Sequence, residues 1–84
     1  MEITYKKQAL KYLEKSDVPV RRKIEKAISG LSELQGDIVK IKGTDLYRLK
    51  IEHYRIGFSY ENETITIEAI LPRGEFYKHI SRRR

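Results

Sequence analysis

The spacing of apolar residues changes along this chain, first from alternation to a helical period and then back. The opening segment MEITY alternates as a short β-strand does. Apolar residues then recur at intervals of three and four over 6–34, which indicates helix. The letters SDVP at 16–19 interrupt this stretch with two capping residues and a proline suited to a first helical turn. The pattern predicts a strand and then a hairpin of two helices, the second running from Pro19 to Leu34.

Beyond residue 37 the apolar residues alternate with polar ones at a period of two, as in half-buried strands. We expect the apolar members to face the helices: Val39, Ile41, Tyr47, Leu49, Ile51, Tyr54, Ile56, Phe58, Tyr60, Ile65, Ile67, Ala69 and Leu71. Pro72 ends the last alternating segment, and RGEFYKHI after it is expected to form a short turn or helix.

These elements predict an α+β fold in the order β-α-α-β-β-β. We expect a twisted antiparallel sheet with the N-terminal helical hairpin packed on one face and a short C-terminal helix or turn. The other face is then left to solvent or a ligand. A chain of 84 residues has room for one domain, so 1–84 is assigned as a single domain.

Composition narrows the possible functions only a little. The chain has 18 Lys and Arg against 12 Asp and Glu, a net charge of +6, which suits an acidic partner such as nucleic acid or an acidic protein. It has no cysteine and only two separate histidines, so we expect no metal and no cofactor. No apolar run reaches membrane-spanning length and the first residues lack a signal-peptide pattern, so a cytoplasmic protein with no membrane partner is expected.

Three cations fall on the side of the predicted sheet opposite the helices. Arg48 and Lys50 share that side of one strand, and a simple hairpin places Arg55 across from Lys50. Like charges that face each other destabilise paired strands unless an anion offsets them. A solvated polar face is the simplest interpretation. A phosphate-binding face is the alternative, because guanidinium groups match phosphate oxygens; further polar groups that follow the last strand favour it, namely Arg73, Tyr77 and His79.

The segments GTDLYRLKIEHYRIGFSY and ITIEAILPRGEFYKHI resemble the C-terminal half of the RelE/ParE superfamily of toxins from type II toxin–antitoxin pairs. The likeness is closest to the RelE-type mRNA interferases. It rests on Gly43, two Tyr-Arg-hydrophobic strands at 47–49 and 54–56, and an Arg–Tyr pair four residues apart at 73 and 77. One position departs from the family pattern, since Glu52-His53 stands where Gly-Asp or a similar pair is usual.

The resemblance implies a ribosome-dependent endoribonuclease that cleaves mRNA in the ribosomal A site by attack of a ribose 2′-hydroxyl, without a cofactor. It implies that Arg48 and Lys50 bind phosphate, with Lys50 also a candidate general base, and that Arg55 stabilises the transition state. Arg73 would clamp phosphate or donate a proton, and Tyr77 would stack on a base or transfer a proton. His79 would contact the substrate as an alternative acid.

The same resemblance implies partners: a small cognate antitoxin in a hetero-oligomer, and the ribosome with its mRNA. Two other functions stay open. One is a ParE-type inhibitor of DNA gyrase, and the other is a non-catalytic module that binds an antitoxin or nucleic acid. The first generally lacks the full set of sheet cations and the terminal tyrosine, both of which this chain has.

Overall fold

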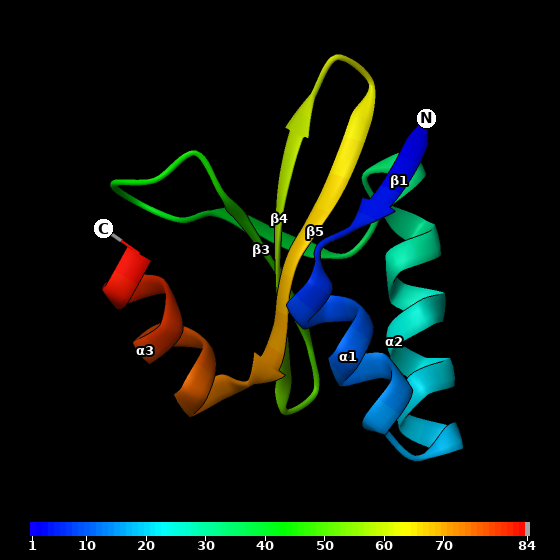
Figure 1. Cartoon of the computed structure of the whole chain (residues 1–84). Coiled ribbons are helices and arrows are strands. Elements are labelled where there is room, and N and C mark those ends of the chain that lie inside the picture. Colours follow the sequence, from blue (N-terminus) through cyan, green and yellow to red (C-terminus); the bar gives the residue numbers. More distant parts are fainter. Residues whose placement is uncertain (84) are drawn as a thin grey trace.

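The computed structural model describes residues 1–83, and the side chains as far as Ser81. Three helices and five strands follow one another along the chain (Figure 1). Their bounds are β1 Glu2–Tyr5, α1 Lys7–Lys15, α2 Val18–Gly30, β2 Asp37–Lys40, β3 Tyr47–Ile51, β4 Tyr54–Glu61, β5 Thr64–Pro72 and α3 Arg73–Arg83, with a 3₁₀ turn at Leu31–Glu33 after α2. None of the described helices is long and apolar enough to cross a membrane.

The α+β class is confirmed, but the sheet is mixed, whereas an antiparallel sheet was predicted. The strand order is β1-β5-β4-β3-β2, one strand more than the predicted order. β1 pairs in parallel with β5, and the other neighbours are antiparallel. Local periodicity predicts each strand, but it does not show that the first strand and the last one lie side by side, because that pairing joins segments about sixty residues apart.

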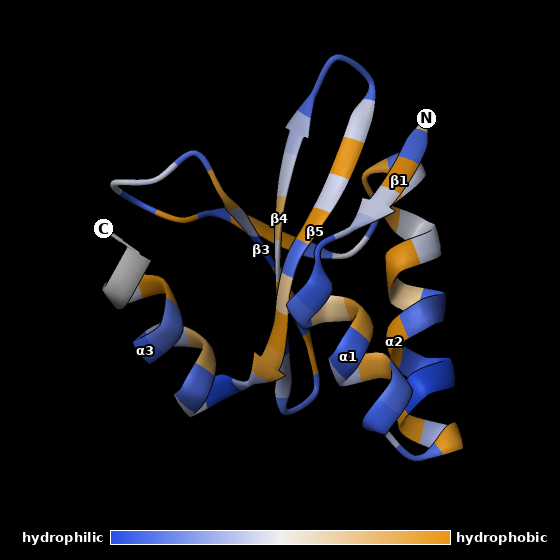
Figure 2. Ribbon diagram, in the orientation of Figure 1, coloured by the Kyte–Doolittle hydropathy of each residue, from blue (hydrophilic) through white to orange (hydrophobic). Residues whose placement is uncertain are grey.

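The helical hairpin packs on one face of the sheet, as predicted. Ala9 and Leu13 of α1 and Ile24 and Ile28 of α2 are buried. They join the side chains of the central strands in the main core: Leu31, Leu49, Ile56, Phe58, Ile65, Ile67 and Ile70. Figure 2 shows hydrophobic residues along the strands and hydrophilic residues in the turns that join them. The second helix ends at Gly30, short of the predicted Leu34.

A β-bulge in the β4–β5 ladder corrects part of the predicted inward face. Gly57 pairs with Ala69 but the next residue, Phe58, pairs with Ile67, so Glu68 is an extra residue in β5. Because side chains alternate along a strand, one extra residue reverses the faces of all that follow. Ile70 therefore points into the main core, and the prediction that Ala69 and Leu71 do so was wrong.

The faces of β2 are also the reverse of the prediction. Ile38 pairs with Leu49 and packs against the main core. Val39 pairs with Arg48 and is 49% exposed, on the face away from the hairpin. Ile41 contacts a second, smaller core instead of the first.

This second core shows that the other face of the sheet is not left open. Figure 1 shows α3 on the opposite side of the sheet from α1 and α2. Phe76 and Ile80, one turn apart on α3, are buried with Leu46 against this face. Gly57 makes the contact possible, because a Cβ there would lie only 3.0 Å from a ring carbon of Phe76. A face open to solvent or ligand was predicted; α3 covers it over β4 and β5.

Candidate functional site

The three strand cations do share one face, as the alternation predicted. Lys50 pairs directly with Arg55 across β3 and β4. Arg48, two residues before Lys50 on β3, pairs with Gly57. They lie on the face that carries α3, because Leu49 between them belongs to the main core. The structure therefore confirms the placement of Arg48, Lys50 and Arg55, although their surroundings differ.

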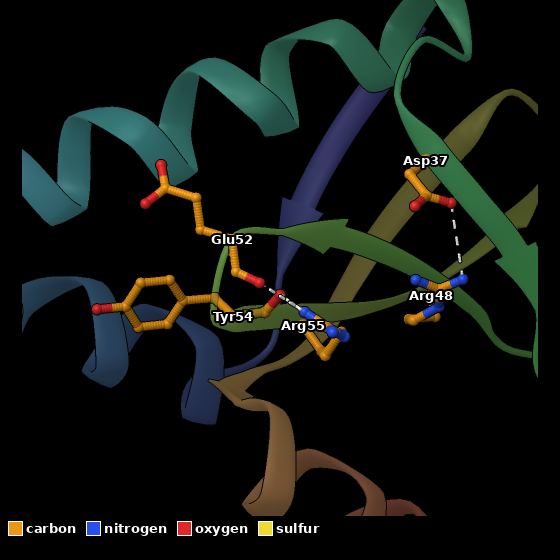
Figure 3. A network of polar contacts seen from close by, with 5 residues as sticks. All are labelled: Asp37, Arg48, Glu52, Tyr54 and Arg55. Atoms are coloured by element: carbon orange, nitrogen blue, oxygen red, sulfur yellow. Dashed lines mark hydrogen bonds and ion pairs between the residues drawn. The ribbon is translucent and has the colours of Figure 1, made fainter.

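Arg55 is buried, with only 6% of its surface exposed, whereas an exposed side chain was expected. Its guanidinium turns back toward the β3–β4 turn (Figure 3), where Nη1 donates 2.9 Å hydrogen bonds to the backbone carbonyls of Glu52 and Tyr54. Its Nε is buried and makes no hydrogen bond. Among the described side chains no carboxylate forms an ion pair with it. A buried cation without a counter-charge is costly, so this site would gain from an anion.

Arg48 and Lys50 differ in exposure and in their contacts with acidic side chains. The side chain of Arg48 is 15% exposed, and its Nη2 lies 3.7 Å from the Oδ1 of Asp37 on the neighbouring edge strand (Figure 3). Asp37 also pairs across the strands with Lys50, which is exposed. This acidic neighbour was not predicted, because its position depends on the register of β2 against β3.

The tight turn of residues 52–53, which joins β3 and β4, contacts both α2 and the start of α3. Glu52 has φ 50°, a left-handed conformation that favours glycine. Its carboxylate forms a 3.2 Å ion pair with Lys23 of α2. The carbonyl of His53 accepts a 2.8 Å hydrogen bond from the backbone N–H of Arg73. The start of α3 is thus fixed beside the turn that Arg55 also binds.

The residues predicted on α3 divide between two sides of the helix. Arg73 and Tyr77 are exposed and lie four residues apart, so they share one side. His79, which is half-buried, lies on the other side of the Phe76–Ile80 stripe, as helical spacing requires. The structure thus groups Arg73 and Tyr77, and separates His79 from them.

Tyr12 of α1 packs beside Tyr54 of β4. The pKa of Tyr12 is raised by burial, by the neighbouring Tyr54 ring and by the charge of Glu75 on α3. The rings of Tyr12 and Tyr54 meet edge to face with centroids 6.3 Å apart. Tyr12 and Tyr54 therefore pack against each other, and Tyr54 faces the helical hairpin as predicted.

Taken together, the site offers cations and one exposed phenol but few acids. Lys50, Arg55, Arg73 and Tyr77 come from β3, β4 and α3, which meet at the 52–53 turn. Among the described residues no group of three or more His, Cys, Asp or Glu side chains is placed to hold a metal ion. Such a set of donors suits the binding of a phosphate group and the stabilisation of negative charge on it.

Sequence reasoning missed the two residues that close this face, Phe76 and Gly57. The signal was present in part, since Phe76 and Ile80 stand at helical spacing after Pro72 and a glycine interrupts the segment YRIGFSY, which forms β4. Each feature alone has many explanations. Their contact becomes visible only once the β4–β5 register is known.

Comparison with known proteins agrees with the fold. No family model matches the chain. Toxin RelE3 of Methanocaldococcus jannaschii is 30% identical over 86 residues, which span 94% of this chain and 98% of that protein. A chain of the RelB–RelE antitoxin–toxin complex from Methanococcus jannaschii is 28% identical, with a TM-score of 0.73 over 90% of this chain and 96% of that one.

Two further solved structures have the same fold. The archaeal RelE–RelB complex of Pyrococcus horikoshii OT3 contains a chain 26% identical to this one, with a TM-score of 0.72 over 87% of this chain and 94% of that one. The isolated Escherichia coli RelE toxin reaches a TM-score of 0.74 at 21% identity, over 98% of this chain and 96% of that one, and supports the fold alone. With a curated relative 30% identical along nearly its whole length, this chain belongs to the RelE family of toxins.

Proposed function

We propose that this chain is the toxin of a type II toxin–antitoxin pair and acts in the cytoplasm as a ribosome-dependent endoribonuclease on mRNA. The observation that carries the chemistry is the Lys50–Arg55 pair. Two cations face each other across β3 and β4, and the guanidinium of Arg55 is buried with no ion-pair partner among the described side chains. A phosphate group at this corner would supply the missing negative charge.

The proposed reaction is an internal transfer at one phosphodiester of the message. The ribose 2′-oxygen bonds to the adjacent phosphorus and loses its proton to a base, while the bond to the 5′-oxygen breaks and that oxygen gains a proton. The products are a 2′,3′-cyclic phosphate and a 5′-hydroxyl, so no further reactant is consumed. Charge that builds up on the phosphate oxygens is stabilised by Lys50 and Arg55.

The remaining roles follow from exposure. Arg73 and Tyr77 share one exposed side of α3, so they are the groups free to reach a bound strand. We assign Arg73 to hold a phosphate and Tyr77 to stack on a base or to transfer a proton. Arg48, already within 3.7 Å of Asp37, contributes charge from the margin of the site. His79, on the other side of α3, is the weakest member of the proposed set.

The partner proposed for this chain is a cognate antitoxin. Two of the similar solved chains were determined as RelB–RelE complexes, in which the antitoxin is bound to the toxin. The net charge of +6 favours a partner that is acidic in its toxin-binding part. The same charge favours the ribosome, whose RNA attracts basic surfaces without reading sequence.

The test is primer extension on mRNA held on translating ribosomes, with two matched tyrosine variants. Tyr77 and Tyr60 are exposed to nearly the same extent, 43% and 41%, but only Tyr77 lies on α3 beside the site. We expect the wild type to cut at A-site codons only when ribosomes are present, Tyr77→Phe to cut about a hundredfold more slowly, and Tyr60→Phe to cut normally. If the wild type makes no cuts and translation continues, the proposal is wrong, and a gyrase supercoiling assay becomes the next experiment.

A further inference from the structure

The side chain of Gln8, in the first turn of α1, binds the outer edge of β5 as a neighbouring strand would. Its Oε1 accepts a 3.0 Å hydrogen bond from the backbone N–H of Ile70, and its Nε2 donates a 3.2 Å hydrogen bond to the carbonyl of the same residue. A primary amide carries a carbonyl and an N–H side by side, so it can satisfy both backbone groups of one strand residue. This contact therefore continues the hydrogen bonding of the sheet with a side chain.

The contact lies where the pairing of β5 with β1 has already ended. The two strands pair as far as Tyr5 and Ile67, and Glu68 is the extra residue of the bulge. Because β1 then gives way to α1, no strand lies beside the outer edge of β5 beyond the bulge in the described part of the chain. The amide of Gln8 supplies the missing partner at Ile70, whose own side chain is completely buried.

This edge contact is only one residue away from the strand position that pairs with Arg55. Successive residues of a strand turn their backbone groups to opposite edges, so those of Leu71 face β4 because those of Ile70 face Gln8. Leu71 pairs with Arg55, and its side chain contacts the second core under α3. Arg73 begins α3 two residues later. Gln8 thus holds the segment of β5 that leads to both site arginines.

The position of Arg55 depends closely on this backbone. Its guanidinium is held by two hydrogen bonds, both donated by Nη1 to backbone carbonyls, and its Nε makes none. The side chain is buried, so it cannot turn toward water to compensate for a shift of the strand. Since a misplacement of about 1 Å can cost a large factor in rate, a small movement of β5 is enough to matter.

We propose that Gln8 is a positioning residue for the phosphate site. Its amide keeps the end of β5 in register beside β4, and so keeps Arg55 and the start of α3 in the arrangement that stabilises charge on the phosphate. The inference rests on the proposed function, because it concerns the same reaction. Since Arg55 is assigned to the transition state, loss of the amide should lower the rate of the chemical step more than the binding of the substrate.

The experiment measures cleavage of mRNA on translating ribosomes over a range of protein concentrations. Gln8→Glu keeps the size of the side chain but places a carboxylate against the carbonyl of Ile70, and Gln8→Ala removes both hydrogen bonds. We expect the rate at saturation to fall about thirtyfold in each, with the half-saturating concentration within about twofold of the wild type. Gln35→Glu makes the same chemical change at an exposed position and should cleave normally.

A second control separates positioning from stability alone. Thr4→Val removes the 3.2 Å hydrogen bond between the hydroxyls of Thr4 and Thr66, on the same β1–β5 edge but before the bulge. Thr4→Val and Gln8→Ala should both lower the midpoint of thermal unfolding by about 5 °C. Only Gln8→Ala should slow cleavage at temperatures well below both midpoints, and only Gln8→Ala should shift the Nε–H signal of Arg55 in NMR spectra of the free protein.

The outcomes separate the inference from the proposed function. If the wild type cleaves and both Gln8 variants reach its saturated rate, the inference is wrong. If Thr4→Val slows cleavage as much as Gln8→Ala does, Gln8 is a structural residue and the inference is also wrong. If the wild type cuts no mRNA, the proposed function fails, and the Arg55 signal then decides alone: an unchanged signal in Gln8→Ala overturns the inference.

Discussion

The two faces of the sheet are built in different ways. On one face eleven buried residues from α1, α2, the 3₁₀ turn and three strands form a continuous apolar cluster. On the other, the buried cluster has three members, Leu46, Phe76 and Ile80, beside a glycine and a buried arginine. Buried apolar area is the main source of stability, so the first face holds the fold. The second face is free to carry groups that cost stability.

This contrast explains why the cations gather where they do. Placing Arg55 within the eleven-residue cluster would surround a charge with apolar side chains. On the second face it reaches two backbone carbonyls of the 52–54 turn, and Lys50 beside it stays in water. The unpaired guanidinium lowers the stability of the protein, and the main core on the other face offsets this loss. Such strained or costly features concentrate at functional sites.

The largest predicted effect compares two phenylalanines that are both almost completely buried. Phe58→Ala, in the main core, should lower the free energy of unfolding by about 3–5 kcal/mol and expose the whole sheet to hydrogen exchange. Phe76→Ala should instead release α3 while the β3–β4 amides stay protected, because the helix contacts only the small cluster. Hydrogen exchange followed by residue measures both.

A uniform loss of protection in Phe76→Ala would contradict this division, since it would show that the second face is part of the same cooperative unit. Should Phe58→Ala fail to fold, Phe58→Leu gives the same comparison at a smaller cost. The wild type provides the reference for both exchange patterns.

A smaller effect is expected when the buried cation is removed. In Arg55→Met two hydrogen bonds to carbonyls are lost, but so is the cost of a buried charge and of its unbonded Nε. These terms oppose each other, so stability should change by no more than about 1 kcal/mol. Cleavage should fall at least about a hundredfold. Urea unfolding and primer extension measure the two, and a variant with clearly lowered stability but normal specific activity would make Arg55 a purely structural residue.

The sequence predicted the main-core face of the sheet better than the face that carries α3. The helices, the strands and the shared side of Arg48, Lys50 and Arg55 came from periodicity, because each depends on neighbours a few residues away. The extra residue Glu68 could not be predicted in this way. A bulge is one inserted residue, and the segment TITIEAIL has apolar residues at 69, 70 and 71. An apolar residue therefore faces the core beyond Glu68 whether or not the bulge is present.

The cover over the second face was missed for a related reason. The spacing of Phe76 and Ile80 indicated a helix, but a helix of eleven residues can pack in several places. Its position depends on Gly57 and on the bond from Arg73 to the carbonyl of His53, both set by long-range pairing. The family resemblance named the candidate site residues, and that assignment stays a prediction, whereas their burial had to come from the structure.

The smallest predicted effect compares the two hairpin turns. In the far turn Asn62 and Glu63 both have positive φ, 51° and 60°, which favours Asn-Gly. Glu63→Gly should therefore raise the free energy of unfolding by about 0.5–1 kcal/mol. In the turn beside the site, Glu52→Gly relieves similar strain at φ 50° but loses the exposed ion pair with Lys23.

The gain from Glu52→Gly should consequently be smaller, by up to about 0.5 kcal/mol, because a surface ion pair contributes little. Urea unfolding of both variants, repeated with Lys23→Ala, measures that difference. The lysine change should lower stability slightly in the wild type and leave Glu52→Gly unaffected. Equal effects of Lys23→Ala in both backgrounds would show that the ion pair contributes nothing.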